Sequence, residues 1–430
     1  MGPKAVGDST SETPGTRRRP VARRVIRLVA VLAGVFLLPV PALCGPQAGS
    51  APEPEETDLP DLIRAWRHKE PPPEKPVGQR SIIATPVIGS NPSSGFVFGA
   101  AGQVTLFRGD PSTTRITFGI ASLTVSTKKQ VSFNLRFDSF SNENRWFIES
   151  DNRLQSTSQE IYGFGSATPS SAALGTNYGF VRLHETVSRK VASDVYVGGG
   201  FRFDSHTDVK PVDEADPNWP TSPYIVYSEQ NGLPISGQQS AGLSVNVLVN
   251  RRDSDISARR GWLASGQYRW SFDGFLGGDS SWQQLEAEAR AYVPFDTIGR
   301  HRLALWTYTS LVTTGVAPYF DVPATVMDTY GRSARGYPEG RYRGERLVYG
   351  EAEYRGPILR NGLLGFVAFA TVTTVSNSQT GERLFDAVAP SGGGGLRLLL
   401  SKRSRTNLCL DFAGGKDGAG GVYLAIQDAF

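Results

Sequence analysis

Most of this chain consists of short segments in which apolar and polar side chains alternate with a period of two. From Val131 to Phe137 every second residue is apolar, and the residues between them are polar or charged. The same pattern recurs in residues 195–204, 243–249, 262–272, 285–293 and 407–412. Successive side chains of a β-strand point to opposite faces of a sheet. The pattern therefore predicts strands with one apolar and one polar face.

A soluble β-sandwich shows the same alternation, so other features decide the environment. No segment of residues 81–430 approaches the ~20 apolar residues that a membrane-spanning helix needs. The expected strands are long, and their polar faces carry both acids and bases. Aromatic residues gather near the expected strand ends: Trp146, Trp262, Trp270, Trp282 and Phe295. These features are typical of an all-β transmembrane antiparallel β-barrel with aromatic girdles and a polar interior.

The polar faces predict a lumen in which both signs of charge are mixed. The expected inward residues are Arg136, Asp138, Glu149, Asp151, Arg153, Arg202, Asp204, Arg269, Glu286, Glu288, Arg290 and Arg397. Such a lining favours holding a loop or plug over selecting ions of one sign.

The spacing of the segments predicts the number of strands. We count ten candidate strands between Gly95 and Thr314 and five between Glu345 and Phe430. Because bacterial barrels have an even number of strands, we expect sixteen. The one strand beyond the fifteen counted is expected in the Gly- and Ser-rich stretch 158–175. Long connections are expected at residues 205–236, 316–344 and 376–390, and long loops of such barrels face outside.

Residues 1–44 are expected to be a cleavable signal peptide. A basic stretch from Arg17 to Arg27 precedes the apolar run 28–38, which is shorter than the ~20 residues of a membrane span. An uncleaved anchor remains an alternative. A lipoprotein attached through Cys44 is disfavoured because Leu43 is larger than the residue expected before a lipidated cysteine.

Residues 45–80 are rich in Pro and Glu and are expected to form a periplasmic linker before a barrel at 81–430. Within this linker, Leu59, Leu62, Ile63 and Trp66 fall on one face of a helix. This helix is expected to lie on the membrane interface or the barrel mouth. A plug or docking helix is the alternative.

Composition excludes several classes of function. The net charge of +4 comes from the basic residues of 1–44, and the rest of the chain is near neutral, so a nucleic-acid partner is not expected. With four His and two Cys, no cluster has zinc spacing. Gly278-Asp279-Ser280 and the Ser-x-x-Lys spacing at Ser126 lack the further elements of a hydrolase. We expect neither an enzyme nor a bound cofactor or metal.

One segment carries a family resemblance. Arg335-Gly336-Tyr337 is followed by Gly340-Arg341-Tyr342-Arg343 and then by Glu353-Tyr354-Arg355. These motifs resemble those of the BamA/TamA superfamily of outer-membrane barrels, also called bacterial surface antigens. The resemblance covers about residues 81–430 and is specific in the loop and the strand after it. It implies sixteen strands, five of them after the loop, and a loop folded into the lumen.

The resemblance also implies site residues. The lumen-loop motif would be Arg335, Gly336, Tyr337, Gly340 and Arg341. In the family an Asp on the following strand often holds the loop arginine, but residues 366–372 contain no acid. We therefore expect Arg335 to pair with Glu353, with Glu351 as second choice. The residues alone leave a solvated surface loop as an alternative.

The C-terminus ends in an aromatic residue, as outer-membrane barrels commonly do. We expect Phe430 to serve as part of the assembly signal. The alternation suggests that Val422, Leu424, Ile426 and Phe430 face lipid, with Asp428 interrupting that face near the interface.

The resemblance implies a function in outer-membrane protein or lipid assembly and transport, in the outer membrane of a Gram-negative bacterium. Outer-membrane lipid, lipopolysaccharide and the barrel-assembly machinery would be its partners. A passive pore or structural barrel is the alternative. One departure bears on the choice: residues 45–80 are too few for the periplasmic POTRA domain that precedes the barrel in family insertases.

The targeting segment generates the first prediction. The mature protein should begin between about Ala42 and Ser50, because cleavage follows the apolar run. N-terminal sequencing of the membrane-inserted protein checks this, and a mature chain that still begins at Met1 would contradict it.

Overall fold

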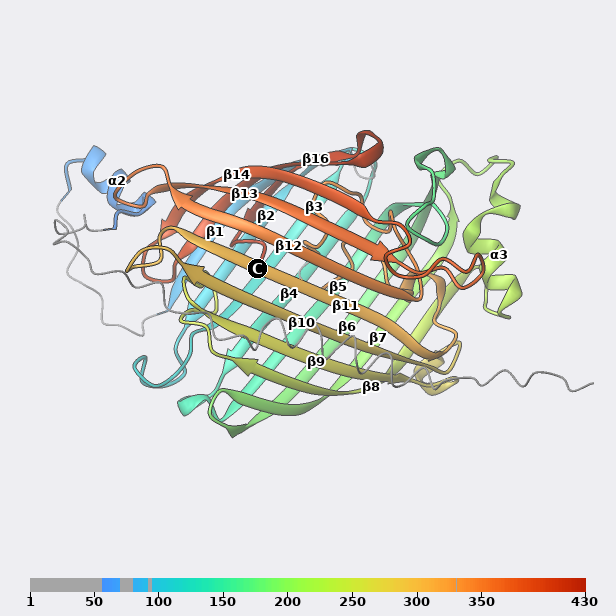
Figure 1. The fold of residues 1–430 in the computed structure, drawn as a ribbon, viewed down its shortest axis with the longest axis horizontal. Helices are drawn as coiled ribbons and strands as arrows, with labels where there is room; N and C mark the ends of the chain where they lie inside the picture. The colour runs from blue at the N-terminus through green and yellow to red at the C-terminus, as the bar shows by residue number, and fades with distance from the viewer. Residues whose placement is uncertain (1–55, 70–79, 92–94, 330) are drawn as a thin grey trace, which may run out of the picture. The chain divides into compact units, whose positions relative to one another are not determined.

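Sixteen antiparallel strands close into a barrel, each paired with its neighbours in chain order and the first with the last (Figure 1). This computed structural model describes residues 56–69, 80–91, 95–329 and 331–430. The expected signal peptide and most of the expected linker lie outside the described residues. The strands are β1 (Ser81–Asn91), β2 (Gly95–Leu106), β3 (Thr117–Ser126), β4 (Val131–Phe140), β5 (Trp146–Ile161), β6 (Leu174–Ala192), β7 (Val195–Pro211), β8 (Gly237–Asn250), β9 (Gly261–Ser271), β10 (Trp282–Pro294), β11 (Arg302–Gly315), β12 (Arg346–Pro357), β13 (Leu364–Val375), β14 (Ala389–Ser401), β15 (Thr406–Gly415) and β16 (Gly420–Ile426). The expected fold class and strand number are confirmed.

The position of one strand was predicted wrongly. Residues 162–173 form a connection between β5 and β6, and the missing strand is β1, which precedes Gly95. Pro86 and Gly89 obscure the alternation of β1, because proline lacks an N–H group and is confined to strand edges. Pro86 is a register partner of Ala100 on β2. It sits in the strand at which the barrel closes.

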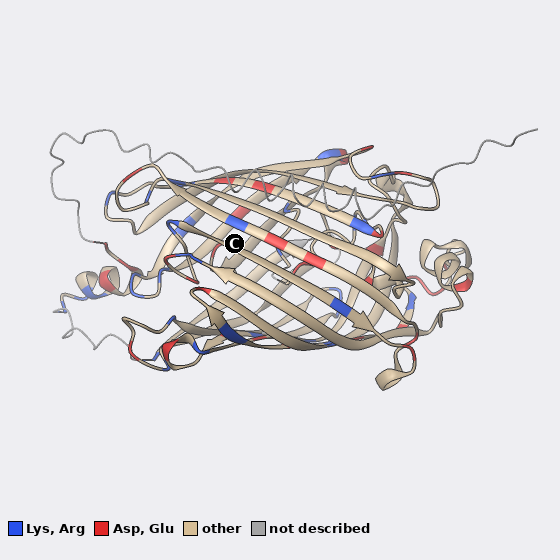
Figure 2. Cartoon of the chain, turned by 60° about the horizontal axis from the view of Figure 1, so that its bottom comes forward, with Lys and Arg blue, Asp and Glu red and all other residues tan. Residues whose placement is uncertain are grey.

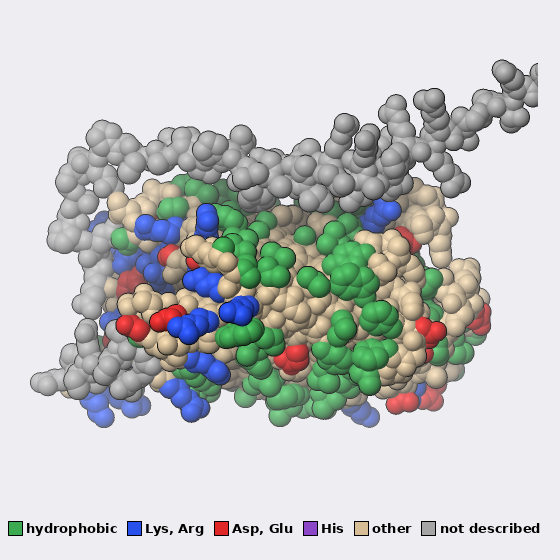
Figure 3. Space-filling view, turned by 90° about the horizontal axis from the view of Figure 1, so that it is seen from below, with side chains coloured by type: hydrophobic (Ala, Val, Ile, Leu, Met, Phe, Trp, Pro, Cys, Tyr) green, Lys and Arg blue, Asp and Glu red, His purple; other side chains and the backbone are tan. Residues whose placement is uncertain are grey.

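As the alternation predicts, apolar side chains of the strands face outward and polar side chains face the lumen. Apolar side chains such as Leu123, Leu243 and Phe412 are exposed on the outside, where hydrophobic groups gather over the middle of the barrel (Figure 3). Charged residues lie along the strands (Figure 2), and several of those inside pair with opposite charges. Asp204, for example, accepts from Arg269 at 2.9 Å and from Arg182 at 2.7 Å.

The aromatic girdle needs one correction. Trp146, Trp262 and Phe295 are exposed near strand ends, but Trp282 is 1% exposed and lies inside. Its indole N–H donates to Ser240 Oγ at 3.2 Å. Trp282 shares the parity of Glu286 and Glu288, so the alternation of β10 directs it inward although a tryptophan at a strand end suggests a girdle.

The two ends of the barrel differ. The long connections 212–236, 316–345 and 376–388 lie at one end, and the first contains helix α3 (Pro223–Gln230). Helix α2 (Leu59–Trp66) lies at the other end (Figure 1). Among the described residues, no helix is long and apolar enough to cross a membrane.

Candidate functional site: a loop held inside the barrel

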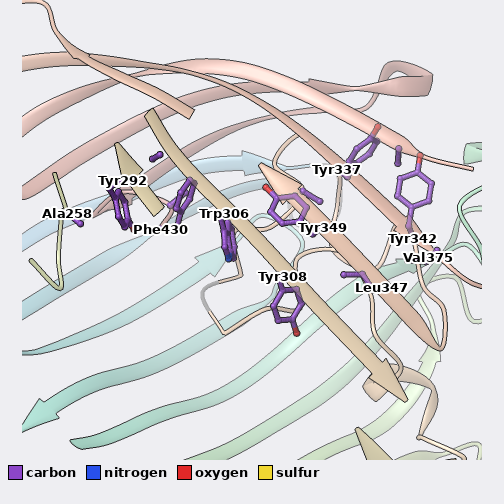
Figure 4. Packing of buried hydrophobic residues seen from close by; sticks show 14 residues of the cluster. Ala258, Tyr292, Trp306, Tyr308, Tyr337, Tyr342, Leu347, Tyr349, Val375 and Phe430 are labelled. Carbon is purple, nitrogen blue, oxygen red and sulfur yellow. The ribbon is translucent and has the colours of Figure 1, made fainter. Parts of the chain in front are cut away.

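The connection between β11 and β12, residues 316–345, enters the barrel and is called here the lumen loop. Its first turn buries Tyr319 and Phe320 against the inward aromatic residues Tyr178 and Phe180 of β6. Farther along, Ala334, Tyr337 and Tyr342 are buried in a second cluster with residues of β11–β13 (Figure 4). Aromatic packing therefore holds the loop at both of these points.

Two glycines allow the backbone of the lumen loop to turn next to the barrel wall. Gly336 has φ +104° and Gly340 has φ +74°, conformations that residues with a side chain rarely adopt. A Cβ atom on Gly336 would lie 3.0 Å from the carbonyl carbon of Gly414 on β15. A Cβ on Gly340 would overlap the side-chain amide of Gln159. Glycine is thus required at both positions by conformation and by space.

Arg335 is placed between these glycine turns and the barrel wall, where it contacts three carboxylates. Its Nη2 donates to Glu353 Oε2 at 2.5 Å and also to Glu351, and its Nη1 donates to Asp411 Oδ2 at 2.7 Å. The guanidinium also stacks on Phe369, with its central carbon 3.6 Å from the ring centroid. Arg335 is 4% exposed and Glu353 is fully buried.

Two of the three carboxylates that contact Arg335 were predicted from the sequence, and one was not. Glu353 and Glu351 both contact Arg335. Asp411 was missed because it lies on β15, 76 positions away in sequence. Only its polar parity within the apolar strand 408–412 could have suggested that it faces the lumen. Phe369 lies in the stretch 366–372, which contains no acid, and it contacts Arg335 through its ring.

The acids keep Arg335 charged. Burial disfavours the charged guanidinium, but Glu353, Glu351 and Asp411 outweigh this and hold the pKa of Arg335 well above its usual value. A buried cation is stable only when it is paired and hydrogen-bonded. Equally, three neighbouring carboxylates need a shared cation. The arginine of the lumen loop and the carboxylates of the barrel wall therefore stabilise each other's charged forms.

A second layer of ion pairs extends this cluster toward the C-terminus. Arg355 donates to Glu353 at 2.6 Å, and Arg397 donates to Asp411 at 2.5 Å. Both arginines reach Asp428, whose carboxylate lies 2.7 Å from Nε of Arg397 and 3.4 Å from Nη1 of Arg355. The charges that face the loop are thus continuous with those that face the end of the chain.

The remaining motif residues fix the path of the loop by hydrogen bonds. Tyr337 donates to the carbonyl of Pro390 at 2.5 Å. Arg341 donates to Thr168 Oγ1 at 3.0 Å and to the Thr168 carbonyl at 2.8 Å, both in the connection between β5 and β6. Arg343 belongs to the same motif, and its chemistry predicts attraction to an acidic lumen wall. Instead it donates to the Tyr319 and Val322 carbonyls and so ties the end of the loop to its start.

The C-terminal residues correct the expectation of a lipid-facing end. Strand β16 ends at Ile426, and Gln427 then adopts φ +73°. This turn directs the tail inward, so that Phe430 packs against Trp306, with ring centroids 5.3 Å apart, and is 5% exposed (Figure 4). Asp428 points into the lumen cluster. The period-two argument failed because the residue at the break has a positive φ.

The lumen loop itself binds this tail. Arg332 donates through Nη2 to the Ile426 carbonyl at 2.9 Å and through Nη1 to the Gln427 carbonyl at 2.8 Å, and it also donates to the Asp428 carbonyl. One side chain of the loop therefore engages three consecutive carbonyls where the last strand leaves the sheet.

The closure of the barrel is called here the seam, meaning the junction of β1 with β16. In the described residues a single register pair, Ser90 with Val422, joins these strands. The neighbouring pair β15–β16 shares seven register positions, from Leu408–Ile426 to Gly414–Gly420. The seam is therefore the least paired junction of the described sheet.

Comparison with known proteins identifies the family. The model of the Omp85 superfamily domain matches residues 127–406. The chain belongs to the Omp85 superfamily. It is thus a bacterial outer-membrane β-barrel, as the resemblance of the loop motif implied. Among curated proteins, none matches this chain.

Solved structures of BamA and CdiB are similar to this chain at low sequence identity. BamA of Haemophilus ducreyi lacking POTRA domains 1–3 is 15% identical over 81% of this chain and 69% of its own, with a TM-score of 0.49. CdiB of Escherichia coli is 10% identical over 83% and 62%, with a TM-score of 0.50. CdiB of Acinetobacter baumannii is 11% identical over 82% and 65%, with a TM-score of 0.49. The chain spans less than two thirds of either CdiB.

Removal of the Arg335 charge should release the lumen loop. Because three buried carboxylates lose their shared cation, Arg335→Ala should destabilise loop docking by ~3–5 kcal/mol. Arg335→Lys should rescue only part of this, because an ammonium cannot reproduce the two-sided contacts of a guanidinium. Cleavage of the folded barrel by chymotrypsin reports loop release. Arg383→Ala is the matched control, since Arg383 is exposed in another long loop and pairs with Asp386.

The ion cluster further predicts non-additive effects. Arg335→Ala combined with Glu353→Ala should cost less than the sum of the single changes, because both changes break the same Arg335–Glu353 ion pair, which can be lost only once. Additive rates of cleavage would show that the two residues do not act together.

Phe430 generates a separate prediction. Phe430→Ala leaves a cavity beside Trp306 and should cost ~3–5 kcal/mol, as for other buried aromatic residues. The measurement is the temperature at which the folded barrel loses its heat-modifiable mobility in a gel. Phe412→Ala, on the lipid-facing side, should have the smaller effect. If Phe430 is also an assembly signal, the yield of inserted barrel falls as well. An equal or greater loss for Phe412→Ala would contradict the inward packing.

Proposed function

We propose that this barrel takes part in the assembly or transport of proteins or lipids in the outer membrane of a Gram-negative bacterium, and that it works at the seam. The observation that carries the proposal is the seam's single register pair. Among the described residues of β1, only Ser90 has a register partner on β16, so most of β1 presents N–H and C=O groups on that side without a ladder partner from that strand. Such a strand edge is a template for an incoming strand.

The packed interior favours a working route through the seam and not through the lumen. The lumen loop lies inside the barrel, held by Arg335 and by the aromatic clusters at its two ends. Charges of both signs pair across the rest of the interior. A passive pore or structural barrel, the alternative, needs an open or inert lumen and gives no role to a weak seam.

The chemistry of a lateral opening indicates which substrates and partners suit this barrel. A route that opens sideways into the bilayer suits substrates with apolar surface, such as a β-strand with a lipid-facing side or the acyl chains of lipid and lipopolysaccharide. The chain's own insertion would depend on the barrel-assembly machinery, through the C-terminal residues.

A disulfide across the seam tests the proposal. Ser90→Cys with Val422→Cys joins register partners and should block lateral opening. In a strain lacking the native protein, this variant should fail to restore outer-membrane protein and lipopolysaccharide levels until a reductant is added. Phe98→Cys with Val125→Cys is the matched control, because it joins outward-facing register partners of β2 and β3. Full complementation by the oxidised seam variant would overturn the proposal.

The alternative has its own readout. A passive pore predicts steady conductance in planar bilayers that the seam disulfide leaves unchanged, whereas a barrel that works at its seam predicts little conductance in either redox state.

A further inference from the structure

Helix α2 is attached to the barrel by its polar side. Its N-cap Asp58 accepts from the backbone N–H of Lys402 at 3.0 Å, and Asp61 contacts Lys402 Nζ at 3.0 Å. The N–H of Thr57 donates to the Asn361 carbonyl at 3.0 Å. The helix is thereby fixed to the connections 402–405 and 358–363, which follow β14 and β12.

The apolar side of α2 is uncovered. Trp66 is 77% exposed, Leu62 47% and Ile63 40%, and no residue of the helix is buried. A helix on a water-facing protein surface normally turns its apolar face toward the core. In α2 the polar face contacts the protein and the apolar face points away from it. The connection that accepts Thr57 extends the apolar surface, because Ile358 and Leu359 are 49% and 43% exposed.

Basic residues lie around this apolar surface. Arg67 and Lys69 follow the helix and are exposed, and so are Arg360 and Arg403 in the two connections that hold it. Basic side chains gather at the α2 end of the barrel (Figure 3). The longest connection at the other end that stays outside the lumen, 212–236, has four acids and no Lys or Arg.

We propose that α2 and the connections 358–363 and 402–405 bind the surface of anionic phospholipid in the leaflet at their end of the barrel. An uncovered apolar helix face with a tryptophan and neighbouring Lys and Arg suits the boundary between headgroups and acyl chains. The strands place these connections at the edge of the exposed apolar band, next to a bilayer surface. Anionic headgroups complement the exposed charges, each of which contributes about a fivefold preference.

This surface is independent of the seam and goes beyond the proposed assembly function. A barrel anchored at one rim in this way would keep the bilayer surface next to its short connections. The polar contacts of Asp58 and Asp61 set the direction of the helix, and the lipid covers the face that they leave exposed.

Depth-dependent quenching tests the location of the helix. The full-length protein carrying Cys44→Ser and Trp66→Cys is labelled with an environment-sensitive fluorophore and reconstituted into vesicles of phosphatidylethanolamine with or without phosphatidylglycerol. The protein carrying Cys44→Ser alone gives the labelling blank for the buried Cys409. The control site is Ser112→Cys, exposed in the connection between β2 and β3. Lipid-borne nitroxide near the headgroup should quench the label at 66 severalfold more than the label at 112.

Charge variants test the lipid class. Arg67→Gln with Lys69→Gln should lower the enrichment of phosphatidylglycerol around the protein by about twenty-five-fold, as measured by mass spectrometry of lipids that remain bound in mixed nanodiscs. Lys128→Gln with Lys129→Gln removes the same charge from the connection between β3 and β4 at the other end and should leave enrichment unchanged.

Each other outcome overturns the proposal. Quenching at 66 by aqueous iodide and not by lipid nitroxide would place the helix in water. Protection from both quenchers would point to a protein partner or a second copy of the chain. Equal effects of the two charge variants would show that the α2 end has no lipid preference.

Discussion

A buried positive charge organises the interior of this barrel. Arg335 carries its charge into a region from which water is largely excluded, and a lone cation there would cost several kcal/mol in lost hydration. Glu351, Glu353 and Asp411 offset this cost, and Phe369 covers the face of the guanidinium. The same acids repel one another when the arginine is absent. The arginine and the acids therefore stabilise each other, and the position of the lumen loop inside the barrel satisfies both.

The loop and the seam are connected through the C-terminal tail. Arg355 and Arg397 link the acids around Arg335 to Asp428, and Arg332 of the loop binds the carbonyls of residues 426–428. These contacts draw the tail away from the sheet after Ile426. The strength of the seam is thus set partly by ion pairs that lie inside the lumen.

Sequence reasoning succeeded where one local rule decides the structure. Alternation gave the barrel, its two faces and the five strands after the loop, because side-chain parity holds throughout a regular strand. It failed where a special residue breaks the rule. Pro86 obscured β1, and the positive φ of Gln427 reversed the direction expected for Phe430. The Glu353 contact was within reach because Glu353 lies on the next strand, whereas Asp411 faces Arg335 only through the closure of the whole barrel.

The register of the seam indicates which pairing with β1 the C-terminal tail loses by turning inward. Ser90 pairs with Val422, so a straight continuation of β16 would set residues 427–430 opposite residues 85–82 of β1. Instead, Asp428 and Phe430 contribute ion pairs and aromatic packing in the lumen. Unpaired backbone groups are costly within a bilayer, and the lumen contacts offset that cost. Any event that withdraws the lumen loop removes Arg332 from the tail and shifts this balance toward a paired seam. The ion pairs of this interior thus favour a weakly paired seam for as long as they hold the lumen loop and the tail inside the barrel.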